Sequence, residues 1–266
     1  MNKYWAVFKI SFQQEFVYRL NFLMSRLRSV LQVFLVFFLW DAVFRNPDRV
    51  LFGYDRVKIL TYAFLVLLVK SLVMQSKVAD IAGEIASGSL SNYLVKPLNY
   101  FRYWWARDAA SKALNTIFTV FEFVILYVLL RPGLFVQTNL IYLGFAIAAT
   151  LMAMRIFITM LTLVSITPVW LPEQTWGPVF LFLTVTGFLS GVMFPLDVLP
   201  SRVLELLYMT PFPYVLFFPI QVYLGKMPID AVMTRMAVSI VWMVVLGVGM
   251  SVVWGWGLRS YRSEGR

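Results

Sequence analysis

The sequence predicts an all-α, polytopic membrane protein with six transmembrane helices. Of its 266 residues, 61% are apolar and 14% are charged, whereas soluble domains have about 45–50% and about 25%. The mean hydropathy is +0.77. The apolar residues also gather into six blocks, each near the roughly 20 residues that a membrane span needs. These blocks are 27–44, 57–75, 109–130, 139–165, 176–194 and 231–254.

Residues 1–25 precede the first block and are predicted to form an amphipathic helix at the membrane interface. Their large apolar side chains recur in steps of three and four, as on one face of a helix. They are Trp5, Phe8, Phe12, Phe16, Leu20 and Leu23. The pattern leaves two interpretations open, because such a helix lies in the interface or packs on neighbouring spans. Charged residues at Lys3, Lys9, Glu15 and Arg19 argue against a cleavable signal peptide.

Lysine and arginine predict the orientation of the spans. They lie mostly between apolar blocks, and more of them fall on one side if both termini are cytoplasmic. The net charge of +10 includes no run of five basic residues. Contacts with lipid headgroups therefore explain the charge better than a nucleic-acid partner.

The residue inventory excludes several kinds of chemistry. The chain has no Cys and no His, which excludes Cys/His metal sites, thiol nucleophiles and Ser–His–Asp triads. It also lacks the Gly-x-x-x-x-Gly-Lys-[Ser/Thr] phosphate loop. We therefore expect no catalytic residue, no metal and no cofactor in this chain, and no hydrolysis of ATP by it.

Two further features stand out between and within the blocks. The connection 195–230 is apolar but broken by prolines, which predicts short re-entrant helices near 204–209 and 214–223. Glu122 and Arg155 fall inside blocks, where a charge is costly without a partner or water. Three interpretations stay open: the two residues pair, they line a cavity, or the boundary of the fourth span is misplaced.

Several motifs carry a family resemblance, in the same order along the whole chain. They are the inner loop Gly83–Pro97, the stretch Ser190–Pro200, Pro211-Phe212-Pro213-Tyr214, Tyr18-Arg19 with Leu39–Val43, and Gly257–Tyr261 with Gly265. Together they resemble the ABC-2 type exporter permeases, in particular a bacterial subgroup often encoded as permease pairs with one ATPase.

The resemblance implies one transmembrane domain over residues 1–266 of a multi-pass protein in the bacterial cytoplasmic membrane. It implies a separate ABC ATPase dimer that binds ATP and Mg, and a second permease, the same or a related chain. The exported substrate would be amphipathic, lipid-linked or drug-like. An ion-driven secondary transporter and an intramembrane enzyme are the alternatives, but the sequence lacks their repeats and convergent polar residues.

The resemblance assigns the ATPase-coupling role to the cytoplasmic loop 77–107. We expect Ser87 or Ser89 to cap a short helix that reaches about Val95. Such a helix would present Leu90 and Leu94 on one face as apolar anchors, with Glu84 at the rim. The coupling residues are Glu84, Gly88, Leu90, Tyr93, Leu94, Lys96 and Pro97. The outer gate would comprise Gly191, Pro195, Pro200, Pro211 and Pro213.

Overall fold

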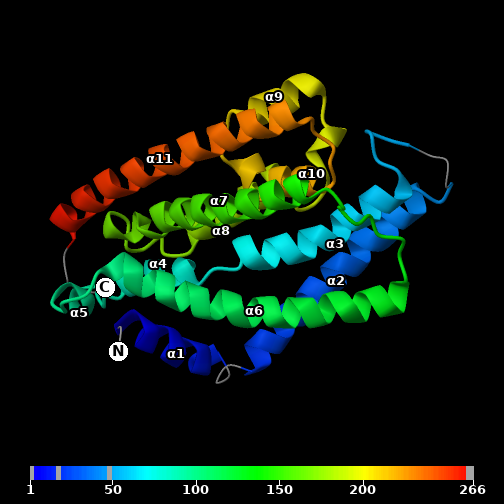
Figure 1. Ribbon diagram of the computed structural model, residues 1–266. Coiled ribbons are helices and arrows are strands. Elements are labelled where there is room, and N and C mark those ends of the chain that lie inside the picture. Colours follow the sequence, from blue (N-terminus) through cyan, green and yellow to red (C-terminus); the bar gives the residue numbers. More distant parts are fainter. Residues whose placement is uncertain (1–2, 16–18, 47–49, 262–266) are drawn as a thin grey trace.

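The computed structural model describes residues 3–15, 19–46 and 50–261. Long helices run side by side, and both ends of the described chain, Lys3 and Tyr261, lie at one end of the bundle, on the left of Figure 1. We call this the terminal end and the opposite one the far end. The described residues contain no β-strand beyond an isolated bridge between Leu51 and Tyr54. The all-α prediction is confirmed for this part of the chain.

Six helices correspond to the six apolar blocks. They are α2 (Arg19–Val43), α3 (Arg56–Val73), α6 (Tyr100–Leu130), α7 (Leu140–Ser165), α8 (Gly177–Leu189) and α11 (Ile229–Ser260). Within the described residues, α2, α6, α7 and α11 are long and apolar enough to cross a membrane, which makes four candidate spans. A fifth results if α3 and the segment 77–86, bent by 43°, count as one broken span. The structure therefore supports a multi-pass protein, whereas α8 has 13 residues and leaves the sixth span a prediction.

Side-chain caps explain where the helices begin. The Asp55 carboxylate accepts a hydrogen bond from the Lys58 backbone N–H at 2.7 Å and starts α3. Asn99 caps α6, and Asn139 caps α7 through the Ile141 N–H at 2.9 Å. These side chains satisfy N–H groups that have no partner in the first turn of a helix.

The N-terminal residues form two helices, so the prediction of a single element over 1–25 is wrong. Helix α1 (Lys3–Glu15) packs against α6, and α2 already begins at Arg19 and continues into the first span. The apolar sequence after Leu20 is long enough to extend α2 without a break. Of the two interpretations, packing on a neighbouring span therefore holds for α1. Its exposed Trp5 and Ile10 leave an apolar face that is also free to contact the membrane interface. Phe16, Tyr18 and Gly265 lie outside the described residues.

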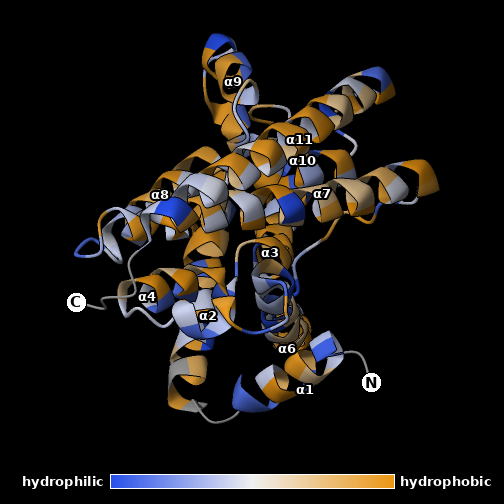
Figure 2. Cartoon of the chain, turned by 90° about the vertical axis from the view of Figure 1, so that its left-hand side faces the viewer, coloured by the Kyte–Doolittle hydropathy of each residue, from blue (hydrophilic) through white to orange (hydrophobic). Residues whose placement is uncertain are grey.

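The outside of the bundle is apolar. Figure 2 shows hydrophobic colouring along α7, α8 and α11. On α11 the exposed side chains include Val241, Val244, Val245 and Val248, which recur at helical spacing. Contiguous apolar faces of this length are rare on soluble monomers, which favours contact with lipid or another membrane subunit.

The segment after α8 folds back into the far end. It contains α9 (Ser201–Tyr208) and α10 (Phe217–Tyr223), close to the two predicted short helices, with the 3₁₀ turns η3 (Leu196–Val198) and η4 (Phe212–Val215) before them. Helix α10 is buried and contacts α3 and α7. Helix α3 in turn contacts α2 and α6, so the core of the molecule lies around α3, α7 and α10.

Gly191 makes the tight turn that sends the chain into this segment. Its φ is +86°, a left-handed conformation that only glycine adopts without strain. Its carbonyl oxygen accepts a hydrogen bond from the Tyr62 hydroxyl at 2.6 Å. A Cβ at this position would lie 2.7 Å from that hydroxyl and 3.1 Å from Cβ of Phe217. The residue predicted to belong to the outer gate therefore has a clear requirement for glycine.

Candidate functional site

The loop that connects α3 to α6 lies at the terminal end. It consists of η1 (Lys77–Asp80), α4 (Ile81–Ala86) and the single turn α5 (Ser91–Leu94). The predicted capping is wrong: α5 has no side-chain cap, and the Ser87 hydroxyl bonds instead to the Glu84 carbonyl oxygen and the Ser89 hydroxyl. Gly88, with φ of +73°, turns the chain between the two helices and prevents one continuous helix.

The loop presents a smaller apolar surface than predicted. Leu90 is fully buried in the core of this chain, so its assignment to an exposed docking face is wrong. Leu94 and Val95 are 45% and 83% exposed, and Lys96 and Pro97 are exposed beside them. We call residues 94–97 the loop surface. Because α5 is only one turn long, Leu90 and Leu94 lie at its opposite ends, one facing inward and one outward.

Glu84 fastens the loop to α6. Its Oε2 accepts hydrogen bonds from the Tyr100 hydroxyl at 3.0 Å and from the Trp104 indole N–H at 3.2 Å. Its Oε1 forms an ion pair with Arg107 at 3.4 Å. The prediction that Glu84 lies at an exposed rim is therefore wrong, since its side chain is 17% exposed. Burial raises the pKa of Glu84, and the hydrogen bond from Tyr100 and the charge of Arg107 oppose this shift.

Two distant parts of the chain also hold the loop. The Tyr261 hydroxyl donates to the Gly88 carbonyl oxygen at 2.8 Å. The Lys3 ammonium donates to the Pro97 carbonyl oxygen at 2.5 Å. Within the loop, the Tyr93 hydroxyl bonds to that of Tyr103 at 3.2 Å. The loop surface is thus presented by a braced element and not by a free connector.

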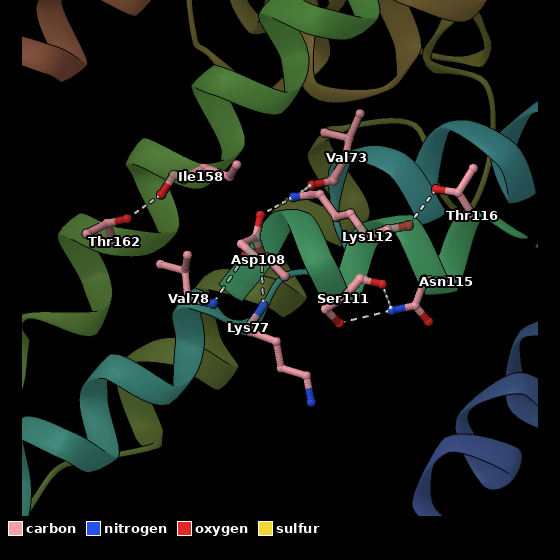
Figure 3. Close-up of polar contacts among 11 residues, drawn as sticks. Val73, Lys77, Val78, Asp108, Ser111, Lys112, Asn115, Thr116, Ile158 and Thr162 are labelled. Atoms are coloured by element: carbon pink, nitrogen blue, oxygen red, sulfur yellow. Dashed lines mark hydrogen bonds and ion pairs between the residues drawn. The ribbon is translucent and has the colours of Figure 1, made fainter. Parts of the chain in front are cut away.

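Asp108 joins the loop to the end of α3, and the sequence analysis missed it. Its carboxylate accepts from the Ser76 hydroxyl at 2.5 Å and from the Lys77 backbone N–H at 2.9 Å, and it pairs with Lys112 at 2.8 Å. Lys112 also donates to the Val73 carbonyl oxygen (Figure 3). Asp108 and Lys112 are both buried, so removing either one would leave an uncompensated buried charge. Their separation by four helical positions was a signal in the sequence.

A second polar site lies at the far end and is centred on Asp197. Its Oδ2 accepts hydrogen bonds from the Tyr54 hydroxyl at 2.7 Å, the Gln221 amide at 2.7 Å and the Lys226 ammonium at 2.8 Å. Lys226 also lies over the Tyr54 ring, 3.1 Å from its centroid. Burial lowers the pKa of Lys226, and Asp197 opposes the shift. This Asp197 cluster fastens the segment after α8 to the connection between α2 and α3.

A match to a known family covers both of these arrangements. A family model described as "ABC-2 family transporter protein" matches residues 30–265, which include the loop surface and the Asp197 cluster. The chain belongs to the ABC-2 transporter family. Comparisons with curated proteins and with solved structures gave no match. Members of the ABC-2 family are membrane components of transporters, so the chain is a permease component.

The intramembrane charges of this ABC-2 family chain do not pair with each other. Glu122 on α6 instead forms an ion pair with Arg26 on α2 at 3.6 Å, and both side chains are buried. Arg26 also donates to the Thr119 hydroxyl at 3.0 Å. Arg155 lies within continuous α7, so the fourth-span boundary does not explain it. Its guanidinium lies 4.4 Å from the Trp105 ring and lines a cleft.

Proposed function

We propose that this ABC-2 family chain is the transmembrane permease subunit of an ATP-driven exporter. The family match over residues 30–265 is the observation that carries the proposal. The chain lacks a phosphate loop, so the ATP and Mg of the cycle belong to a separate ABC ATPase dimer. A second permease, the same or a related chain, completes the transmembrane part. The substrate is amphipathic, lipid-linked or drug-like and leaves the cytoplasm or inner leaflet.

The loop surface is the proposed contact for the ATPase. Leu94, Val95 and Pro97 supply an exposed apolar patch, and Lys96 adds a charge beside it. Such patches rimmed by polar groups suit insertion into a partner's groove. Gly88, Leu90 and Tyr93 shape the loop behind it. Force on the patch reaches α6 through Glu84 and reaches the end of α3 through Asp108.

The proposed topology has six spans and both termini in the cytoplasm of a bacterium. The terminal end then faces the cytoplasm, and α9 and α10 are re-entrant helices in the outer leaflet. Buried α10 with its proline breaks supports this, because irregular backbone at membrane depth occurs inside protein or beside a cavity. In this arrangement Gly191, Pro195, Pro200, Pro211 and Pro213 shape the outer gate.

Cysteine labelling tests the topology on a chain that has no cysteine of its own. Ser260→Cys places a thiol at the end of α11, and Thr138→Cys places one in the connection between α6 and α7; both positions are exposed. We expect a membrane-impermeant maleimide to label Thr138→Cys on intact cells. Ser260→Cys should react only after permeabilisation. If Ser260→Cys is labelled on intact cells as fast as Thr138→Cys, the proposed cytoplasmic location of the C-terminus is contradicted.

A further inference from the structure

A cleft of about 410 Å³ opens between the start of α6 and the terminal-end halves of α7 and α11. Arg102 and Trp105 line it from α6, Arg155 and Thr159 from α7, and Ser251 and Trp254 from α11. None of these residues belongs to the loop surface or to the Asp197 cluster. The cleft is therefore separate from the proposed ATPase contact and from the Asp197 cluster.

The charges in the cleft are all positive. Its lining includes two arginines and no Asp or Glu. Among the described residues, neither Arg102 nor Arg155 forms an ion pair, whereas Arg26 and Arg107 each have a carboxylate partner. Arg155 is also partly buried, ten residues from the end of α7. A guanidinium at such a depth is costly unless water or a counter-charge reaches it.

The rest of the cleft lining combines aromatic and apolar side chains with polar ones, namely Phe101, Trp105, Met250 and Trp254 with Asn99, Thr159, Thr162 and Ser251. Trp254 packs edge-on against Phe101 with ring centroids 4.7 Å apart, and Trp105 holds Arg155 on its ring face. Tryptophan favours the boundary between headgroups and hydrocarbon because its ring is amphipathic. The cleft thus combines positive charge with aromatic surface, which suits an anionic headgroup together with the first part of an acyl or prenyl chain.

We propose that this cleft binds the phosphate-bearing headgroup of an anionic lipid from the inner leaflet. The planar guanidinium of Arg155 supplies two parallel N–H donors to the phosphate oxygens, and Arg102 adds charge at the mouth. Trp254 contacts the first part of the lipid chain. The lipid then provides the counter-charge that the described chain does not place beside Arg155. The assignment to the inner leaflet rests on the proposed topology, whereas the binding chemistry does not.

Lipid selectivity of the purified chain tests this site. Quenching of tryptophan fluorescence by dibrominated phosphatidylglycerol is compared with quenching by dibrominated phosphatidylcholine in mixed micelles. We expect the wild type to prefer phosphatidylglycerol and Arg155→Gln to reduce that preference about tenfold, the size of one lost charged hydrogen bond. Arg235→Gln is the matched control, because Arg235 also lies over an aromatic ring, that of Tyr208, at the far end. It should leave the preference unchanged.

Arg102→Gln is the second variant, in case Arg155→Gln fails to fold, because Arg102 is exposed. It should lower the preference for phosphatidylglycerol by a smaller factor than Arg155→Gln does. Unchanged selectivity in every folded variant of the two arginines overturns the proposal. Inorganic phosphate is added as a competitor of the lipid. If it abolishes the preference at the same concentration as unlabelled phosphatidylglycerol does, the site binds a soluble phosphate, and the proposal is also overturned. Arg155→Gln should still co-purify with the ATPase, so loss of lipid selectivity and loss of the transporter assembly are separate results.

Discussion

Replacing Leu94 and Val95 together by Asp should remove the ATPase from the purified complex while the chain still inserts. Both side chains are exposed and lie outside the long helices. An unpaired carboxylate buried in a dry contact costs several kcal/mol. Since each 1.4 kcal/mol is about tenfold in affinity, the loss exceeds about a hundredfold. Affinity purification of a tagged chain from membranes, followed by quantification of the ATPase, measures it.

Two controls separate a lost contact from a damaged chain. Val136→Asp with Thr138→Asp introduces the same charges at exposed positions of the far end and should retain the ATPase. Leu90→Asp should instead lower the yield of folded chain, because Leu90 is buried in the core. If the Leu94/Val95 variant retains the ATPase with wild-type affinity, the loop surface is not the contact, and exposed α1 becomes the next candidate.

Removing the Asp197 carboxylate should lower the stability of the protein markedly. Asp197→Ala leaves Lys226, whose side chain is 11% exposed, without its carboxylate and also unpairs Tyr54 and Gln221. Breaking a fully buried pair by deleting one partner costs about 3–5 kcal/mol, and because the Asp197 side chain is 23% exposed we expect a loss below that range. We expect thermal unfolding of the purified protein in detergent to shift to markedly lower temperature.

Asp41→Ala is the matched control for this effect. Asp41 pairs with Arg56 at 2.7 Å, but the two side chains are 34% and 45% exposed. An exposed ion pair contributes about 0–1 kcal/mol, so this variant should unfold near the wild-type temperature. Equal shifts for the two aspartates would show that the Asp197 cluster is no more than a surface pair.

The sequence predicted the helices well because their signals are local. Apolar blocks mark the long helices, and the prolines between 195 and 230 mark the breaks around α9 and α10. Where the sequence misjudged the exposure of residues in the loop, that exposure depends on how the loop folds in space. Leu90 and Leu94 look equivalent in a helical pattern, but Gly88 ends α4 and shortens α5 to one turn, which turns Leu90 inward.

Polar pairings were predictable only within one helix face. The three partners of Glu84, which are Tyr100, Trp104 and Arg107, follow the spacing of one face of α6, and Asp108 pairs with Lys112 one turn away. By contrast, the Arg26–Glu122 pair and the Tyr54–Asp197 bond join residues that are far apart in sequence. A single sequence offers no pattern that links such residues, since their contact depends on how the helices pack.

A photo-crosslinking residue at position 94 tests the central claim most directly. Leu94 is replaced by p-benzoylphenylalanine in the complete transporter, cells are irradiated, and the adducts are identified by mass spectrometry. The proposed function predicts one main protein adduct, a chain that carries the Gly-x-x-x-x-Gly-Lys-[Ser/Thr] phosphate loop. The same crosslinker at exposed Val136, at the far end, should not capture that chain. Adducts at position 94 with lipid alone, or with a protein that lacks a phosphate loop, would contradict the assignment of this chain as an ATP-driven permease.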